Sequence, residues 1–403
     1  MAITDFREDF SSRYQDILSK SLVAMKIANT RLKSGLKAGD VVHRFALDLS
    51  SVLVRDITNL TDRTIDPVTD SDQTLTIDQK KGTTFPIAHW EEVQAGELNP
   101  GMTAGKQVAL KVAVYVDASV LSEAQNGFAN FDTGNLTTTA STGTPIALTT
   151  TNLPQMLGQA HARLKANNAP MTGLVWVVDP YVASIIAQHP IGKDTQLGDV
   201  TFKNGYSGLV YGAQLFISNN LTGEAVLGMA TQPTANDTVV VNGVTFQFVA
   251  TIGSAGDLHI GSNVDATRAN MAEAFNAIGT AIAEASDTGY TVVSSADQAT
   301  WNALRITATD SASADTLTIV AIGSGRLTLS ETFTDGTDAW DTNFIHCYYG
   351  QKGAIDVVIQ DEVKMKMLQE PKQDTMNILN DVLFGVQTFT DGSQYFLDVH
   401  VDA

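Results

Sequence analysis

The sequence predicts an α+β protein in which a small α/β segment interrupts a larger body. Strand-like alternation of apolar and polar residues dominates residues 41–88 and the region after residue 340. Apolar residues recur at helical spacing in three longer stretches, which are 5–30, 103–126 and 153–170. A third observation is NDTVVVNGVTFQFV at 236–249, a hairpin pattern that differs from the sequence on either side. We therefore expect an inserted unit at about residues 229–340.

Length and composition are typical of a soluble globular protein with a sizeable core. The chain has 403 residues, of which 43% are hydrophobic and 17% are charged, so we expect two or three domains. No apolar run reaches the roughly 18 residues of a membrane span, and the start lacks the basic and then apolar pattern of a signal peptide. The single cysteine, Cys347, excludes an intrachain disulfide and is typical of a reducing cytoplasm.

The charge of the chain is acidic and unevenly distributed. The formal net charge of −19 argues against bulk attraction to nucleic acid, because phosphate binding needs clustered Lys and Arg. Residues 1–44 hold eight Lys/Arg and five Asp/Glu, which gives +3, and the other 359 residues hold 17 and 39, which gives −22. A basic arm of this kind can pair with the acidic body of a neighbouring molecule. The alternative is a solvated amphipathic helix.

Residues 5–30 predict an amphipathic helix that Thr4 or Asp5 caps. Its apolar stripe follows helical spacing and consists of Phe6, Phe10, Tyr14, Ile17 and Leu18. Such a stripe must be buried, either on the body of the same chain or on a partner molecule.

Residues 41–88 predict a long two-stranded ribbon. The strand-like stretches are VVHRFAL, SVLVRDIT and TLTIDQKKGTTFPIA, and in the last of them Leu75 and Ile77 alternate with polar residues. Residues 59–73 are polar and rich in turn formers. Because isolated ribbons are marginal in water, a ribbon that reaches away from the core indicates that something else supports it.

A long helix is expected at about 103–126, where valines recur every four residues and Gly127 ends the helix. The segment ALKVAVYV also alternates with a period of two, so a strand is the alternative there. A connector rich in Thr, Ser and Gly follows. Residues 153–228 then predict an α/β unit with a helix, the buried strand LVWVV, a second helix and the strand GAQLFISNNL. Asp179 is the expected cap of the second helix, and Pro180 its first residue.

Residues 229–340 predict an inserted domain with the order ββαβββ. Asn242-Gly243 is a strong hairpin signal because both turn positions need a positive φ. A helix is expected at 265–285, and strands return in YTVVSS, NALRITAT and DTLTIVAI. The segment holds three Lys/Arg and twelve Asp/Glu, an acidity that keeps an exposed domain soluble.

The region after residue 340 predicts strands again. Two of them are expected to form a hairpin around Asp391-Gly392. The last strand is expected to pair within a sheet that begins early in the chain.

The sequence contains no pattern that indicates an enzyme. The motifs HExxH, CxxC, GxGxxG, GxSxG and GxxxxGKS/T are absent. His346 and Cys347 are adjacent, but neighbours in a strand point to opposite faces and make a poor catalytic pair. Two groups of aspartates either hold Ca²⁺ or are turn residues. The first group is Asp66, Asp70 and Asp72, and the second is Asp335, Asp338 and Asp341. Turn residues are favoured because no EF-hand spacing is present. We therefore expect no catalytic residue, no cofactor and no metal.

The order of the parts outside 229–340 resembles the major capsid proteins of tailed bacteriophages, which have the Hong Kong 97-type fold. The basic start resembles the N-terminal arm of that family. The stretches AGDVVHRFALDLSSVLVRDIT and TLTIDQKKGTTFPIAHWEEVQAG resemble its extended loop, and the helix at 103–126 resembles its spine helix. TMNILNDVLFGVQTFTDGSQYFLDV resembles the strands that return to its peripheral domain. The resemblance is a pattern of elements without a short invariant motif, and it covers nearly all of 1–228 and 341–403.

The resemblance implies five parts. These are an N-terminal arm (1–40), an extended β-ribbon loop (41–92), a peripheral domain with the spine helix (93–149 and 371–403), an axial domain (150–228 and 341–370) and the small α/β insertion domain (229–340). The family accommodates inserted domains within the axial domain, and by analogy this one is expected on the outer face of a shell.

The implied function is that of a major capsid protein, made in the bacterial cytoplasm and located in the virion. It would self-assemble through hexamers and pentamers into an icosahedral shell around double-stranded DNA, without sequence-specific DNA binding and without a membrane. Scaffolding, portal and decoration proteins are implied partners. The expected contacts between subunits are Phe6, Phe10, Tyr14, Ile17, Asp66, Asp70, Lys80 and Lys81. The alternatives are an encapsulin-like nanocompartment shell that encloses cargo enzyme, a tail or surface protein whose 229–340 segment binds a receptor, and an enzyme.

Overall fold

The computed structural model describes residues 23–32, 41–48, 52, 66, 68–88, 100–138, 140–188, 209–277, 293–334, 338–370 and 375–402. The chain divides into two compact units, one of which comprises 1–18, 29–112 and 355–389, while the other comprises 19–28, 113–354 and 390–403. Of the helix predicted at 5–30, the described part contains only a short helix, α2 (Ala24–Ile27). None of the helices within the described ranges combines the length and the apolar character that a membrane span requires.

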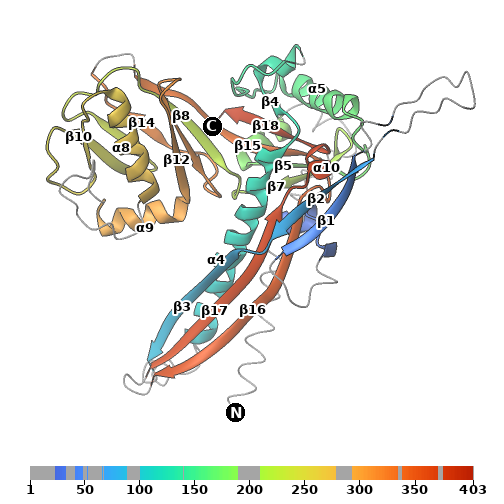
Figure 1. Cartoon of the computed structure of the whole chain (residues 1–403), viewed down its shortest axis with the longest axis horizontal. Coiled ribbons are helices and arrows are strands. Elements are labelled where there is room, and N and C mark those ends of the chain that lie inside the picture. The colour runs from blue at the N-terminus through green and yellow to red at the C-terminus, as the bar shows by residue number, and fades with distance from the viewer. Residues whose placement is uncertain are drawn as a thin grey trace, which may run out of the picture. The chain divides into compact units, whose positions relative to one another are not determined.

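The first unit contains a three-stranded antiparallel sheet of long strands. Its order is β16 (Asp356–Glu370), β17 (Thr375–Gln387), β3 (Gln79–Ala88), and Figure 1 shows the three strands side by side. The register of β16 against β17 shifts around Asp361, which marks β-bulges. The strand character predicted for 79–88 is therefore confirmed, but the partner of β3 is a strand from near the end of the chain.

A separate two-stranded sheet in the same unit joins β1 (Val41–Asp48) to β2 (Thr69–Thr76). The predicted alternation is confirmed, because Leu75 and Ile77 are buried. The prediction that 59–73 form a turn-rich connection is wrong for residues 69–73, which lie in β2. β2 also lies close to β17, since a Cβ on Gly385 would stand 2.5 Å from the carbonyl oxygen of Thr76.

The predicted long helix is α4 (Pro100–Leu121), followed by the 3₁₀ helix η3 (Ser122–Asn126). Val112, Val116 and Val120 are buried. The helix predicted from the four-residue period of valines is therefore confirmed, and the alternative prediction of a strand is wrong. The 3₁₀ helix η3 continues α4 and stops before Gly127, where the helix was predicted to end, but the φ of this glycine is −62°. Glycine is needed there because a Cβ would lie 2.9 Å from the backbone nitrogen of Asp398.

The second unit contains a nine-stranded mixed sheet. Its main path is β12 (Ile306–Ser311), β13 (Thr316–Ala321), β8 (Gly223–Gly228), β15 (Ala339–Gln351), β5 (Leu174–Val178), β7 (Ala213–Ile217), β6 (Leu209–Val210). Off this path, β18 (Phe396–Asp402) pairs with β15 and with β4 (Asn130–Phe131). All five residues of β5 are buried, which confirms the buried strand predicted from LVWVV.

The helices of this unit include α5 (Leu153–Ala166) and α6 (Pro180–Gln188), and a 3₁₀ helix, η4 (Thr133–Leu136), precedes them. The capping prediction for α6 is confirmed. The carboxylate of Asp179 accepts a hydrogen bond from the backbone N–H of Val182 at 2.8 Å, and Pro180 is the first helical residue.

A four-stranded sheet occupies much of the segment 229–340. Its order is β11 (Asp257–His259), β10 (Val244–Val249), β9 (Thr238–Val241), β14 (Leu329–Glu331). The predicted hairpin is confirmed in register, because Val241 faces Val244 and both Asn242 and Gly243 have positive φ. The predicted helix is present as α8 (Val264–Ala277), and its continuation to 285 lies outside the described residues.

Two expectations for this segment need correction. A second helix, α9 (Ser295–Leu304), begins where the strand YTVVSS was expected to end and includes Leu304, which was expected in a strand. The hydrophobic core of the segment also contains Ala225 and Leu227 of β8. Met229, which directly follows β8, belongs to the same core. Strands β12 and β13 belong to the nine-stranded sheet, so this sheet and the segment share a core.

The hairpin predicted around Asp391-Gly392 is wrong. A one-turn helix, α10 (Thr390–Ser393), separates β17 from β18, and the two strands belong to different sheets. Gly392 is needed because a Cβ would stand 2.3 Å from the carbonyl oxygen of Ala354. The expectation for the final strand is confirmed, since β18 pairs in parallel with Asn130–Phe131.

Candidate functional site

Of the predicted contact residues, the structure describes four, namely Asp66, Asp70, Lys80 and Lys81. Phe6, Phe10, Tyr14 and Ile17 lie outside the described residues. Asp66 is half-buried and precedes β2, and Asp70 is exposed within β2. Lys80 and Lys81 are exposed on β3, where they face Leu383 and Val382 of β17 across the sheet.

The β1–β2 ribbon has an exposed outer face that carries two large apolar side chains among polar ones. Val41, His43 and Phe45 alternate onto this face, and the exposed fractions of Val41 and Phe45 are 39% and 72%. Across the ribbon they face exposed residues of β2, among them Asp72, whose carboxylate lies 2.7 Å from Nδ1 of His43. An exposed phenylalanine on an edge ribbon is available for contact with another molecule.

The inner face of the ribbon is anchored by a buried carboxylate. Asp356, which is 2% exposed, accepts a hydrogen bond from the side-chain amide of Asn29 at 2.6 Å and lies 3.5 Å from a guanidinium nitrogen of Arg44. The guanidinium of Arg44 also lies over the ring of Phe389, 5.1 Å from its centroid. Val42 packs on the same side against a small core that contains Leu75, Ile77, Val358 and Phe389. The ribbon is therefore fixed on one face and open on the other.

A buried cluster of ionisable side chains lies on one face of the nine-stranded sheet. His346 on β15 faces His400 on β18 directly across the strand pair. Both imidazoles contact the same carboxylate oxygen of Asp398, at 2.7 Å from Nδ1 of His346 and 2.9 Å from Nε2 of His400. The Nε2 atom of His346 lies 3.1 Å from the carboxylate of Glu224 on β8.

The cluster is charged and almost completely buried, with exposed fractions of 3% for His346, 1% for Asp398 and 6% for His400. Burial acts to lower the pKa of His346, but the charges of Asp398 and Glu224 and the hydrogen bonds to them raise it to about 9. Burial acts to raise the pKa of Asp398, while both histidines lower it below its ordinary value. His346 therefore keeps its second proton to a higher pH than a free imidazole does, and it lies between Asp398 and Glu224.

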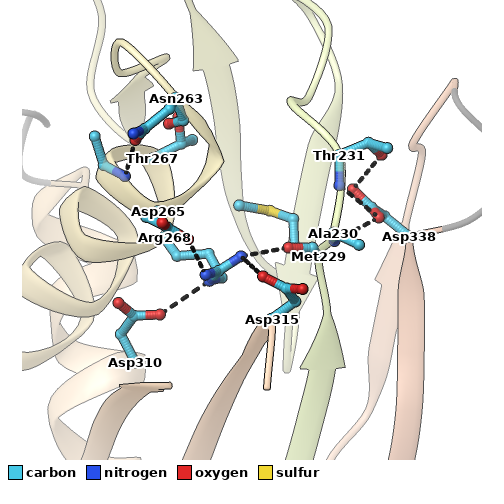
Figure 2. A network of polar contacts seen from close by, with 11 residues as sticks. Met229, Ala230, Thr231, Asn263, Asp265, Thr267, Arg268, Asp310, Asp315 and Asp338 are labelled. Atoms are coloured by element: carbon cyan, nitrogen blue, oxygen red, sulfur yellow. Dashed lines mark hydrogen bonds and ion pairs between the residues drawn. The ribbon is translucent and has the colours of Figure 1, made fainter. Parts of the chain in front are cut away.

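A second network joins α8 to the end of β8 (Figure 2). The guanidinium of Arg268 is fully buried. It donates to the carbonyl oxygen of Met229 at 2.6 Å and to a carboxylate oxygen of Asp310 at 3.0 Å. Asp265 accepts a further hydrogen bond, and Asp315 lies 3.3 Å away. Three carboxylates thus neutralise one buried cation, and the cation in turn holds the first residue of the segment 229–340.

The other end of that segment is held next to the first. Asp338 is 5% exposed, and its carboxylate accepts hydrogen bonds from the backbone N–H groups of Ala230 and Thr231 at 2.9 and 3.3 Å. The hydroxyl of Thr231 donates to the same carboxylate at 3.0 Å. Figure 2 shows Asp338 directed toward both residues. The chain therefore enters and leaves the segment at neighbouring positions.

The acidic groups considered as turn or Ca²⁺ residues have other environments. Asp70 and Asp72 lie in strand β2, so the turn assignment is wrong for them. Asp335 lies outside the described residues. Asp338 binds backbone N–H groups, as described above. Cys347 is fully buried, and burial raises the pKa of its thiol, which removes the reactive thiolate.

Sequence reasoning missed the cluster around His346. Asp398 and His400 are two residues apart in a strand, so their side chains share a face. That spacing could have indicated a pair of ionisable side chains on one face of the last strand. The pairing of β18 with β15 and of β15 with β8 could not be read from the sequence, because these strands are separated by long stretches of chain.

The fold is that of a phage capsid chain. A chain from the capsid structure of the cyanophage P-SCSP1u aligns with 94% of this chain and 88% of its own length, at 12% identity and a TM-score of 0.50. A chain from Mycobacterium phage Che8 aligns with 94% of this chain and 90% of its own length, at 13% identity and a TM-score of 0.51. No family model matches the sequence, and the comparison with curated proteins found no match.

Proposed function

We propose that this protein is a major capsid protein of a tailed bacteriophage, with the Hong Kong 97-type fold, which self-assembles into an icosahedral shell around double-stranded DNA. The observation that carries the proposal is the likeness to the cyanophage capsid chain over 94% of the sequence. The net charge of −19 supports it, because the wall of a DNA container should not bind its contents tightly. We expect no enzymatic activity.

The physical argument is that the isolated chain leaves contacts incomplete. The β1–β2 ribbon is packed on its inner face only, and its outer face carries the exposed Val41 and Phe45. Repeated heterologous contacts between identical subunits would cover such surfaces and build a closed shell. Permanent assemblies of this kind often bury more than about 2,000 Å² per interface.

The five parts expected from the sequence belong to this proposal, including the inserted domain at 229–340. Its support is that Arg268 and Asp338 hold the two ends of the segment at one place, a geometry that permits insertion into another domain. The shared core with β8 indicates that the inserted domain is built onto the nine-stranded sheet. We place it on the outer face of the shell, where its acidity favours solubility.

The contacts proposed between subunits include the arm residues Phe6, Phe10, Tyr14 and Ile17 together with Asp66, Asp70, Lys80 and Lys81. Deletion of residues 1–22 tests the arm, because it removes the apolar stripe and leaves α2 in place. We expect the truncated chain to remain folded and to form few closed shells. Shells at the yield of the full-length protein would contradict this role of the arm.

The ribbon is tested by Phe45→Asp. The side chain is 72% exposed, so the free energy of unfolding of the subunit should change by only about 0.5 kcal/mol. Particle yield, measured by electron microscopy and size-exclusion chromatography, should fall sharply, because a charge would enter an apolar contact. The matched variant Val42→Asp lies on the inner face and should instead destabilise the subunit. Normal assembly of Phe45→Asp would remove the ribbon from the proposed interface.

A further inference from the structure

We propose that His346, His400 and Asp398 bind a divalent transition-metal ion of the Zn²⁺ class, which joins strand β15 to strand β18. Two imidazoles and one carboxylate are a donor set that Zn²⁺ accepts, with a fourth position left for water or another ligand. One ligand atom from each of the three residues lies within 4.8 Å of the other two. This inference is independent of the proposed function.

The sheet register places the two imidazoles opposite each other. The backbone N–H of His346 donates to the carbonyl oxygen of Thr222, and the carbonyl oxygen of His400 accepts from the N–H of Ile146. Their backbone groups therefore point away from each other, which makes His346 and His400 a non-hydrogen-bonded pair. Side chains of such pairs approach closely, with a Cα separation of about 4.5 Å. Asp398 follows on the same face because it lies two residues from His400.

The surroundings of the three residues match those of a metal site. A histidine that binds a metal through one ring nitrogen usually donates its other N–H to a carboxylate, which fixes the ring. Here Nδ1 of His346 faces Asp398 and Nε2 faces the carboxylate of Glu224 at 3.1 Å. The ring of His400 stacks on Phe344 at 4.5 Å between centroids, so its orientation is also set.

Asp398 provides the strongest indication of a missing ligand. Its side chain is only 2% exposed, and both histidines contact the same oxygen, Oδ2. The other oxygen, Oδ1, is buried without a hydrogen-bond partner in the described part of the chain. A buried carboxylate oxygen without a partner is costly, and a cation that both oxygens of Asp398 coordinate would remove that cost.

Binding exchanges a proton for the metal. The nitrogen–oxygen distances of 2.7 and 2.9 Å are hydrogen-bond lengths, whereas ligand atoms around a tetrahedral Zn²⁺ stand somewhat farther apart. The ion would take the place of the proton between His346 and Asp398, which leaves to solvent as the ion enters. His346 keeps its second N–H for Glu224.

Metal content of the untagged full-length protein, produced in zinc-supplemented medium, tests the proposal. After dialysis against a metal-free buffer, we expect elemental analysis to find about one zinc per chain in the wild type. The variant His400→Gln should retain little or none. His259→Gln removes a half-buried histidine on β11 and serves as the matched control, with zinc content equal to that of the wild type.

A spectroscopic measurement on the wild type keeps the test independent of how the variants fold. Production with Co²⁺ in place of Zn²⁺ should give the intense visible absorption of a four-coordinate cobalt site. Equal zinc content in wild type and His400→Gln would overturn the proposal, and so would a wild-type protein that retains neither ion. The cluster would then be a hydrogen-bonded charge network only.

Discussion

At the scale of single residues, buried charges hold together segments that are far apart in the sequence. Asp179 caps α6, as its position before Pro180 predicts, and the same carboxylate accepts a hydrogen bond from Arg326 at 2.6 Å. The guanidinium of Arg326 also donates to the backbone carbonyl oxygen of Asp402. The cap follows from local sequence, whereas the ion pair depends on sheet topology and could not be predicted from local sequence.

Arg268 gives the largest expected effect of a single substitution. Arg268→Met removes the fully buried cation and leaves Asp265, Asp310 and Asp315 without it. Because Asp310 is the least exposed of the three carboxylates, its uncompensated charge should dominate the loss. We expect the free energy of unfolding, measured by urea denaturation, to fall by about 2–4 kcal/mol.

Asp315→Asn is the matched control for Arg268→Met. The side chain of Asp315 is 53% exposed, so solvent screens its charge and the expected loss is about 1 kcal/mol or less. Equal losses for the two variants would show that the buried cation does not dominate the network.

Asp132 predicts a pH dependence of stability. Burial acts to raise the pKa of its carboxyl, but hydrogen bonds from Ser141, Gly143, Thr142 and Gly134 lower it below the ordinary value of 3.8. A carboxyl whose pKa is lower in the folded state than in the unfolded state stabilises the fold at pH values above its unfolded-state pKa. This contribution is lost as the pH falls through the folded-state pKa. Stability should therefore decrease below about pH 3.8.

Asp132→Asn tests this linkage by denaturation at several pH values. The amide supplies one acceptor oxygen in place of two, so we expect a loss of about 1–3 kcal/mol at pH 7. The difference between the two proteins should shrink in acid, since protonation of Asp132 removes the same contribution. A difference that stays constant down to pH 2 would contradict the assignment.

At the scale of elements, the sequence predicts those whose signal is local. The β9–β10 hairpin follows from Asn242-Gly243, and β5 follows from five consecutive apolar residues. Asp391-Gly392 carries a similar turn signal, yet the chain there forms the short helix α10 and passes to another sheet. Turn residues specify a local reversal and do not specify which strands pair. For the same reason the sequence could indicate that Asp398 and His400 share a face, but it could not place His346 beside them.

Gly243→Ala tests the local hairpin signal. The φ of Gly243 is +84°, in the left-handed region, and a Cβ there would meet no atom within 4 Å. Any cost is therefore conformational, and we expect about 1 kcal/mol less stability in urea denaturation. Gly253→Ala is the matched control, because that glycine is equally open and does not have a positive φ. A cost at Gly253 as large as that at Gly243 would contradict the explanation.

At the scale of the whole molecule, the account concerns surfaces that one chain leaves uncovered. The ribbon of β1 and β2 is pinned on its inner face by Asp356 and exposes Phe45 on its outer face. The basic first 44 residues accompany an acidic remainder, a distribution that favours contact between different copies of the chain. We infer a subunit that reaches its working form by assembly.

Electron microscopy of the purified full-length protein, across a range of concentrations, tests this claim most directly. The account predicts closed particles of uniform size with icosahedral symmetry, built from this chain alone. A protein that stays a monomer at every concentration, salt level and pH examined would contradict it.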